Sequence, residues 1–120
     1  MPPKISEGQN EAAINAGVDA LLGKGWNLVN NQLEKNYVFK TYTKVSDMHH
    51  VIATRAKSVN HHPTMISTMS TLKVIWTTHK PPGLSNKDIQ MADYCDEQAS
   101  SIGTVEPSET PQCGPTPSTM

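Results

Sequence analysis

Five histidines are the residues of this sequence best suited to move protons. Four of them form adjacent pairs, His49-His50 and His61-His62, and the fifth is His79. Histidine is the one side chain whose ordinary pKa lies near neutrality, and general acid–base catalysis needs such a group. The histidines are therefore the first candidates for a catalytic site.

The three groups of histidines differ in their local setting. His49-His50 falls within a predicted helix, beside its apolar stripe, where a pair on the helix surface is the ordinary outcome. His61-His62 is followed by Pro63, which stiffens the chain where a helix ends. His79 ends a predicted strand, and a hairpin of neighbouring strands would bring it close to His61-His62. Chance placement of these three histidines is the alternative interpretation.

Metal, thiol and phosphate chemistry find little support in the sequence. Three histidines could hold zinc, but no H-x-x-x-H, C-x-x-C or histidine–carboxylate spacing accompanies them. In an extended chain, His61 and His62 would point to opposite faces. Cys95 lies on a predicted helix stripe and Cys113 in a polar tail, so neither resembles an activated nucleophile. No glycine-rich phosphate loop is present, and we expect neither a metal nor a cofactor.

Length and composition limit the classes of protein. The chain has 120 residues, of which 36% are hydrophobic and 5% aromatic, enough for one domain with a small two-layer core. No apolar stretch approaches the roughly 18–20 residues of a membrane span, and no signal-peptide pattern begins the chain. Two cysteines do not make a disulfide framework. We expect a cytoplasmic protein, with the nucleus as the alternative, and no membrane partner.

Charge is unevenly distributed along the chain, although the net charge is −1. Basic residues dominate from Lys24 to Lys87, whereas residues 88–109 carry acids and no base. A basic segment raises the question of nucleic-acid binding. Because Arg55 is the only arginine and base-specific readers depend on arginine, the sequence argues against a nucleic-acid partner.

Hydrophobic periodicity predicts an α+β fold, with a four-stranded antiparallel sheet and three helices packed on one face. The expected order is helix, two strands, helix, two strands, helix. The first helix has a stripe of Ile14, Val18, Leu21 and Leu22, and Ser46 is the expected N-cap of the second, which ends near Asn60. The expected strands cover 26–29, 37–41, 65–69 and 72–79. Ser85 and Asp88 form a capping box that opens the third helix.

The ends of the chain are poor in apolar residues. We expect a flexible N-terminus over residues 1–8, a single domain over 9–99 and a disordered C-terminal tail over 100–120.

Several of these motifs together resemble the pterin-4a-carbinolamine dehydratase family, whose members are also called dimerisation cofactors of a homeodomain transcription factor. The resemblance rests on the runs Lys57–Pro63, Thr77–His79 and Gly83–Ala92, with Gly25-Trp26 and Tyr37-x-Phe39 upstream. It covers about residues 21–99. The spacing between the histidine pair, the Thr-His pair and the Gly-Leu-Ser-x-x-Asp run makes it specific.

The resemblance implies dehydration of 4a-hydroxytetrahydropterin, such as 4a-hydroxytetrahydrobiopterin, to quinonoid dihydropterin. This reaction recycles the pterin cofactor of aromatic amino acid hydroxylases, with the pterin as substrate and no further cofactor or metal. His61 and His79 are implied to be the acid and base, in either order, and His62 to orient the substrate. Further pterin contacts are implied for Asn60, Met65 and Thr78. The resemblance also implies a homodimer or homotetramer.

Two features leave alternatives open. Asp88 matches an aspartate of the family, but closing the capping box with Ser85 explains it at least as well as a place in the site. Met65 and Met69 stand where the family usually has aromatic residues, and Lys57 where it often has an acid. Methionine offers no rigid flat face to a pterin. The alternative function is a non-catalytic dimerisation or assembly partner, or a transcriptional coactivator, of the same fold.

Overall fold

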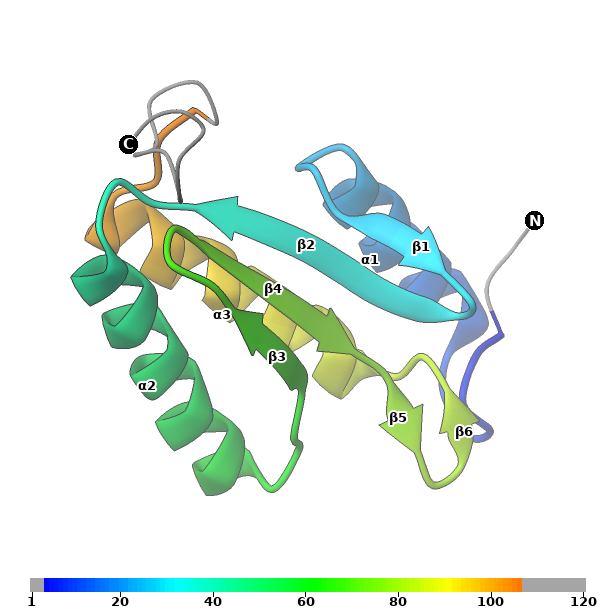
Figure 1. Cartoon of the computed structure of the whole chain (residues 1–120). Helices are drawn as coiled ribbons and strands as arrows, with labels where there is room; N and C mark the ends of the chain where they lie inside the picture. The colour runs from blue at the N-terminus through cyan, green and yellow to red at the C-terminus, as the bar shows by residue number, and fades with distance from the viewer. Residues whose placement is uncertain (1–3, 107–120) are drawn as a thin grey trace.

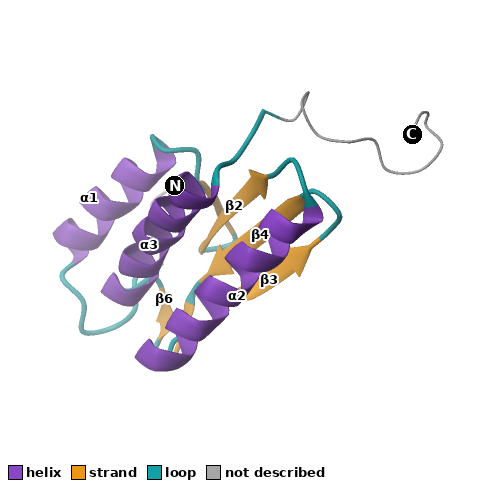
Figure 2. Ribbon diagram, turned by 90° about the vertical axis from the view of Figure 1, so that its left-hand side faces the viewer, coloured by secondary structure: helices purple, strands orange, loops and turns teal. Residues whose placement is uncertain are grey.

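The computed structural model describes residues 4–106, in which three helices cover one face of a four-stranded antiparallel sheet (Figures 1 and 2). The predicted α+β class is therefore confirmed. The elements are α1 Glu11–Leu22, β1 Asn27–Val29, β2 Gln32–Val38, α2 Tyr42–Val59, β3 Thr64–Ser67, β4 Thr71–Trp76, β5 Thr78–His79, β6 Pro82–Gly83 and α3 Asn86–Ile102.

The main sheet has the strand order β1-β2-β4-β3, with every neighbouring pair antiparallel. Its register follows the hydrophobic pattern of β4, in which Leu72, Val74 and Trp76 are all fully buried on the face beneath the helices. Side chains alternate across a strand, so Lys73 faces the opposite side, where it forms an ion pair with Glu34 at 3.2 Å. The predicted alternation of β4 is confirmed.

Helix α2 starts earlier than the sequence analysis expected. Its N-cap is Thr41, whose side chain accepts a hydrogen bond from the backbone N–H of Lys44, and the predicted N-cap Ser46 is wrong. The reason is Val45, which is fully buried and extends the apolar stripe by a turn. The predicted end is right, because Asn60 adopts the left-handed conformation that stops the helix.

Three other predicted elements differ from the structure. Strand β2 covers Gln32–Val38 rather than the predicted 37–41. Its first half was missed because the inward-facing residues include the polar Lys35, which hides the alternation, and the predicted end at Thr41 is wrong because Thr41 caps α2. Leu22 is 40% exposed, so the buried stripe of α1 ends at Leu21. The predicted strand 72–79 is divided in the structure: β4 ends at Trp76, and His79 lies on β5, which pairs with β6 in a separate two-stranded sheet where a loop was expected.

Both ends of the domain extend past the expected boundaries. Within the segment expected to be flexible, Ile5 pairs with Leu84 as a parallel β-bridge. At the other end, α3 continues to Ile102, and the backbone N–H of Val105 donates to the carbonyl of Val38 at 2.9 Å. The rest of the expected tail, residues 107–120, lies outside the described residues.

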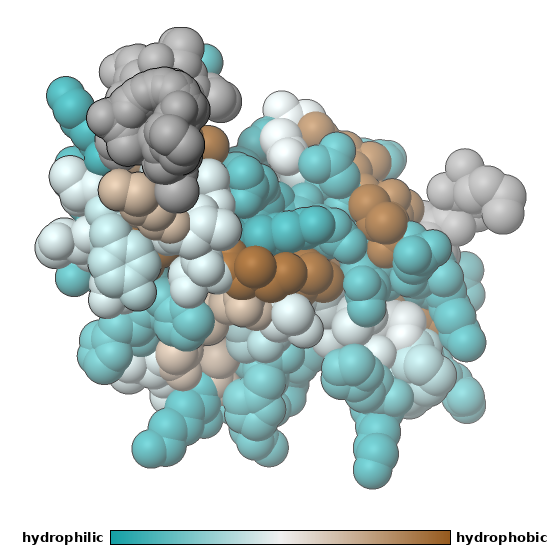
Figure 3. All heavy atoms as spheres, in the orientation of Figure 1, coloured by the Kyte–Doolittle hydropathy of each residue, from teal (hydrophilic) through white to brown (hydrophobic). Residues whose placement is uncertain are grey.

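The face of the sheet opposite the helices carries no covering element among residues 4–106. Figure 3 shows this face with apolar atoms gathered over its middle and hydrophilic atoms around them. Ile66 and Val29 are its exposed large hydrophobic residues, at 50% and 41%. None of the described helices combines the length and apolar character needed to cross a bilayer.

Candidate functional site

One cavity of about 780 Å³ brings together the histidines that the sequence analysis singled out. It lies where the end of α2, the hairpin β5–β6 and the start of α3 meet, at the lower end of the sheet in Figure 1. The lining residues are Ser6, Gln9, Asn60, His61, His62, Pro63, Thr64, Thr78, His79, Lys80, Pro81, Ser85, Asn86 and Lys87. They include two lysines and no carboxylate. The volume is in the range of small-molecule binding sites.

The end of helix α2 fixes the position of His61. Asn60 has φ 55° and ψ 43°, and its backbone N–H donates to the carbonyl of Lys57. The N–H of His61 donates to the carbonyl of Ala56 at 3.1 Å. These two bonds make a Schellman motif, which turns the chain sharply after the helix. His61 therefore leaves α2 in a defined direction, at the edge of the cavity.

The imidazole of His61 is held on two sides. Its ring stacks on the indole of Trp76, with centroids 5.6 Å apart and an interplanar angle of 12°. Its Nε2 lies 2.6 Å from Oδ1 of Asp88, which is fully buried. A carboxylate oxygen accepts hydrogen bonds, so we assign the ring proton to Nε2, which donates a hydrogen bond to Asp88. This bond leaves Nδ1 as the nitrogen with a free lone pair in the neutral ring.

The second oxygen of Asp88 holds the start of α3. Oδ2 accepts hydrogen bonds from the hydroxyl of Thr78 at 2.7 Å and from the backbone N–H of Ser85 at 2.9 Å. The bond from Ser85 belongs to the predicted capping box, which the structure confirms. Asp88 thus has both of the roles that the sequence analysis set against each other: one oxygen caps α3 and the other holds His61.

The two remaining histidines of the cavity are more accessible. His79 lies on β5, where it pairs with Pro82 of β6, and His62 follows His61 in the turn before β3. Both side chains belong to exposed residues, whereas His61 is only 9% exposed. The site therefore combines one buried, fixed imidazole with two that solvent and a ligand can reach.

Some predicted site residues lie elsewhere. Met65 faces the core side of β3 and packs against the hydrophobic core, outside the set that lines the cavity. Met69, in the turn after β3, is 48% exposed and also outside that set. His49 and His50 border a separate hollow of about 330 Å³ between α2 and β3, consistent with their interpretation as a helix-surface pair. Asn60 and Thr78 do line the cavity.

Cys95 packs in the core beneath the sheet and is fully buried. Burial raises the pKa of its thiol from 9.0 to about 12, so the thiol is protonated and inert near neutral pH. Within residues 4–106, no three side chains of histidine, cysteine, aspartate or glutamate are grouped closely enough to hold a metal ion.

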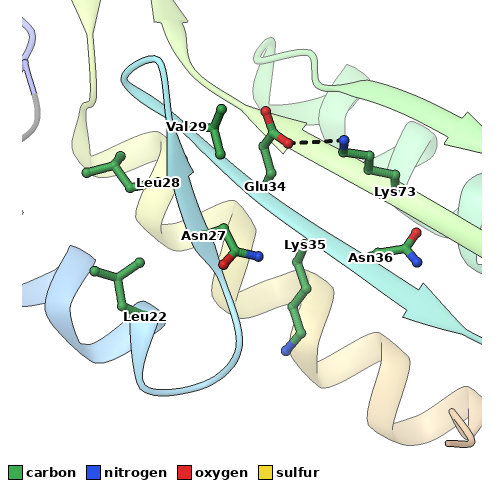
Figure 4. Close-up of a pocket in the computed structure, with 8 residues that line it drawn as sticks. All are labelled: Leu22, Asn27, Leu28, Val29, Glu34, Lys35, Asn36 and Lys73. Atoms are coloured by element: carbon green, nitrogen blue, oxygen red, sulfur yellow. Dashed lines mark ion pairs between the residues drawn. The ribbon is translucent and has the colours of Figure 1, made fainter. Parts of the chain in front are cut away.

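A larger hollow, of about 880 Å³, lies beside β1 and β2 (Figure 4). Figure 4 shows Glu34 and Lys73 paired on one side of β2, while Lys35 points away toward α3. The lining of this hollow contains no histidine and no other group suited to proton transfer near neutral pH. We therefore place the candidate site in the histidine cavity.

Lys35 belongs to a second polar cluster, centred on Asp96 of α3. The Asp96 carboxylate accepts hydrogen bonds from the ammonium of Lys35 at 2.8 Å, the hydroxyl of Tyr37 at 2.7 Å and the indole N–H of Trp26 at 3.1 Å. The donors come from β2 and from the loop before β1. This cluster joins α3 to the sheet at a distance from the histidines, and all of its groups are paired, as expected of a structural contact.

Sequence reasoning missed two contributors to the site. The bond between His61 and Asp88 joins residues 27 positions apart, and only the packing of α3 against the end of α2 creates it. Ser6 and Gln9 line the cavity from the N-terminal segment, which carries no hydrophobic pattern that could have indicated it.

Comparisons with known proteins agree with the geometry. Residues 7–98 match the sequence model of the family described as Pterin 4 alpha carbinolamine dehydratase. A pterin-4-alpha-carbinolamine dehydratase of Drosophila melanogaster is 30% identical over 92 residues, which are 75% of this chain and 48% of that protein. A protein of Jannaschia sp. (strain CCS1), provisionally named as the same dehydratase, is 30% identical over 97 residues, 79% of this chain and 99% of its own length.

Solved structures show the same fold. A transcriptional coactivator/pterin dehydratase from Brucella melitensis superposes with a TM-score of 0.67 at 25% identity, covering 75% of this chain and 96% of that one. A pterin dehydratase-like protein, identified as a RuBisCO assembly factor in the alpha-carboxysome, has a TM-score of 0.55 at 14% identity and covers 62% of this chain and 89% of its own. At that identity, the second likeness shows the fold alone.

Proposed function

The chain belongs to the pterin 4 alpha carbinolamine dehydratase family, and on that premise we propose that it dehydrates 4a-hydroxytetrahydropterin to quinonoid dihydropterin. The observation that carries the proposal is the single cavity lined by His61, His62 and His79, with His61 held by a buried carboxylate. Imidazole is the group that this reaction needs, because both of its proton transfers take place near neutral pH.

The reaction removes water across one carbon–nitrogen bond. The hydroxyl on C4a accepts a proton from an acid and leaves as water while the C4a–O bond breaks. A base takes the proton from N5, and the electron pair of that N–H bond forms the C4a–N5 double bond. One group thus loses a proton and another gains one in each turnover, and the two exchange these protons with water before the next.

His61 is suited to be the base. Its Nε2–H donates to Asp88, so the lone pair of the neutral ring is on Nδ1, the nitrogen that Asp88 does not occupy. When Nδ1 takes the proton from N5, the imidazolium that forms stays paired with the Asp88 carboxylate at 2.6 Å. The carboxylate fixes the tautomer and stabilises the charge, as in other carboxylate–histidine pairs.

His79 is then the acid and His62 the residue that orients the substrate. His79 is exposed at the cavity, so a proton that it gives to the leaving hydroxyl can be replaced from water. His62 lies beside His61 but has no bond to Asp88, and it can donate a hydrogen bond to the pterin ring.

The test is dehydration of a synthetic 4a-hydroxytetrahydropterin, followed by stopped-flow absorbance. We expect His61→Ala and His79→Ala each to lower kcat roughly 10²–10⁴-fold, the usual contribution of a proton-transfer group. His62→Ala is expected to act mainly on KM. The matched control is His50→Ala, since His50 borders a different hollow. A wild-type rate no faster than that in buffer would overturn the proposal.

A non-catalytic assembly or coactivator role is the second candidate. It is favoured by the large apolar side chains left exposed on Tyr42, Ile66 and Met69, at 58%, 50% and 48%, and by the name of the Brucella melitensis relative, a transcriptional coactivator/pterin dehydratase. An inactive wild type that still binds another protein through these side chains would support it.

A further inference from the structure

The segment of residues 4–9, here called the N-terminal strap, forms one wall of the histidine cavity. It pairs with the chain beside β6 rather than with the main sheet. The backbone N–H of Ser6 donates to the carbonyl of Leu84 at 2.8 Å, and the N–H of Leu84 donates to the carbonyl of Lys4 at 2.9 Å. The strap therefore lies directly against the hairpin that carries His79.

Two side chains of the strap add to this backbone pairing. The hydroxyl of Ser6 donates to the carbonyl of Pro81, at the tip of the hairpin, over 2.7 Å. Ser6 is only 2% exposed, so this bond is protected from competing water. The side-chain oxygen of Gln9 accepts a hydrogen bond from the N–H of Asn86 at 3.0 Å, which ties the strap to the first residue of α3.

Gly83 shows how closely the strap and the hairpin approach. It is buried and has a φ of +124°, a backbone conformation that favours glycine. A Cβ at this position would lie 2.8 Å from the carbonyl carbon of Ile5 and 2.8 Å from the nitrogen of Ser6. These are backbone atoms that cannot rotate away, so the hairpin fits the strap only with glycine here.

The hairpin needs such support because it is very small. Strands β5 and β6 have two residues each and pair only with one another, and an isolated two-stranded hairpin is marginal in water. One side is anchored at Thr78, whose hydroxyl donates to Asp88. The other strand, β6, pairs with His79 through Pro82 and is held by the bond from Ser6 of the strap to Pro81.

We propose that Ser6 is a positioning residue for His79, acting through the hairpin. The inference rests on the proposed function, since it concerns the geometry of the proposed acid. The match to the family model begins at residue 7, so Ser6 lies before the matched part of the chain. A contribution from Ser6 would extend the site beyond the matched residues.

The test uses Ser6→Ala in the full chain, with Ser58→Ala as matched control. Ser58 donates the same kind of bond, from its hydroxyl to the carbonyl of Arg55 at 2.8 Å, but on the surface of α2. We expect Ser6→Ala to lower kcat roughly tenfold with KM changed less than twofold, because a small displacement of a catalytic group is costly. Ser58→Ala should leave both parameters unchanged.

Pairing Ser6→Ala with His79→Ala separates positioning from a general loss of structure. If Ser6 acts through His79, its substitution has no further effect on kcat once His79 is absent. Equal losses in both backgrounds, or an unchanged kcat for Ser6→Ala, would overturn the inference.

Hydrogen exchange supplies a readout that does not depend on activity. The backbone amides at positions 78–80, 83 and 84 should exchange roughly fivefold faster or more in Ser6→Ala and in Gly83→Ala than in the wild type or in Ser58→Ala. Unchanged exchange in Ser6→Ala would refute the strap's role even in an inactive protein. If the wild type dehydrates no pterin but exchange is still faster in Ser6→Ala than in the wild type, the proposed function alone is refuted.

Discussion

Replacing Asp88 by asparagine separates its two roles, because the two side chains have nearly the same shape. Oδ1 of Asp88 accepts from His61 Nε2 at 2.6 Å, and Oδ2 accepts from Thr78 and from the N–H of Ser85. An asparagine keeps one acceptor oxygen and gains an NH₂ group that can only donate. The bonds at Oδ2, which include a longer one from the hydroxyl of Ser85 at 3.5 Å, outnumber the one at Oδ1, so we expect the amide oxygen to remain at the start of α3.

The NH₂ group would then face His61, with a donor opposite the donor Nε2–H. To avoid this, the ring must shift its proton to Nδ1, which removes the lone pair that acts as the base. We expect kcat to fall roughly 10²–10⁴-fold in Asp88→Asn, the range for loss of a general base. Stability should fall by only about 1–3 kcal/mol, because the bonds at Oδ2 survive without their charge.

The assay combines stopped-flow dehydration with urea unfolding. Thr41→Ala is the matched control: it removes the N-cap of α2, away from the cavity, and should cost about 0.5–2 kcal/mol without changing kcat of the folded protein. An Asp88→Asn variant with kcat within threefold of the wild type would refute the assignment of His61 as a base oriented by Asp88. If Thr41→Ala lowered the measured rate as much as Asp88→Asn does, the loss in both variants would reflect folding and not the orientation of His61.

Three further predictions concern the core. Asp96→Asn should lower the free energy of unfolding by roughly 2–3 kcal/mol, because it weakens three bonds that include a partly buried ion pair; urea titration measures this, and a change below 0.5 kcal/mol would contradict it. Cys95 should resist alkylation in the native state and react in denaturant, so rapid labelling of folded protein would show that α3 opens. Burial raises the pKa of both Cys95 and Tyr37, so the folded state holds their protons more tightly than the unfolded state. The free energy of unfolding should therefore fall as the pH rises above about 9. For Cys95 the fall is up to about 1.4 kcal/mol per pH unit between pH about 9 and 12. Cys95→Ala should flatten that alkaline decline, and an unchanged slope would contradict the sign.

Elements were predictable from the sequence where the buried positions are apolar and the exposed positions polar. Strand β4 alternates cleanly because one of its faces is core and the other is not. The capping box of α3 is local, since Ser85 and Asp88 are three residues apart. By contrast, β2 was misplaced because Lys35 faces inward and is accommodated only by Asp96, which is 61 residues away. The hydrophobic periodicity of a segment does not predict a partner so distant in the chain.

The site, too, was predictable only in part. The three histidines could be chosen from their type and spacing, but what holds them could not. The strap binds the hairpin chiefly through backbone atoms of Lys4, Ser6 and Leu84, and backbone groups leave no trace in the sequence. The two explanations of Asp88 seemed to compete only because a sequence does not show that a carboxylate has two oxygens facing different partners.

That division of one carboxylate connects the stability of the fold to the chemistry of the site. The positive end of α3 favours a negative charge at Asp88, and the bonds from Thr78 and Ser85 satisfy Oδ2. Oδ1 is then left to accept the hydrogen bond from His61. The other end of the arrangement is the Schellman motif of α2, which sets the backbone of His61, with Trp76 stacked against its ring. Two helix ends thus determine which nitrogen of one imidazole can take a proton, so a substitution that loosens either end should cost activity before it costs folding.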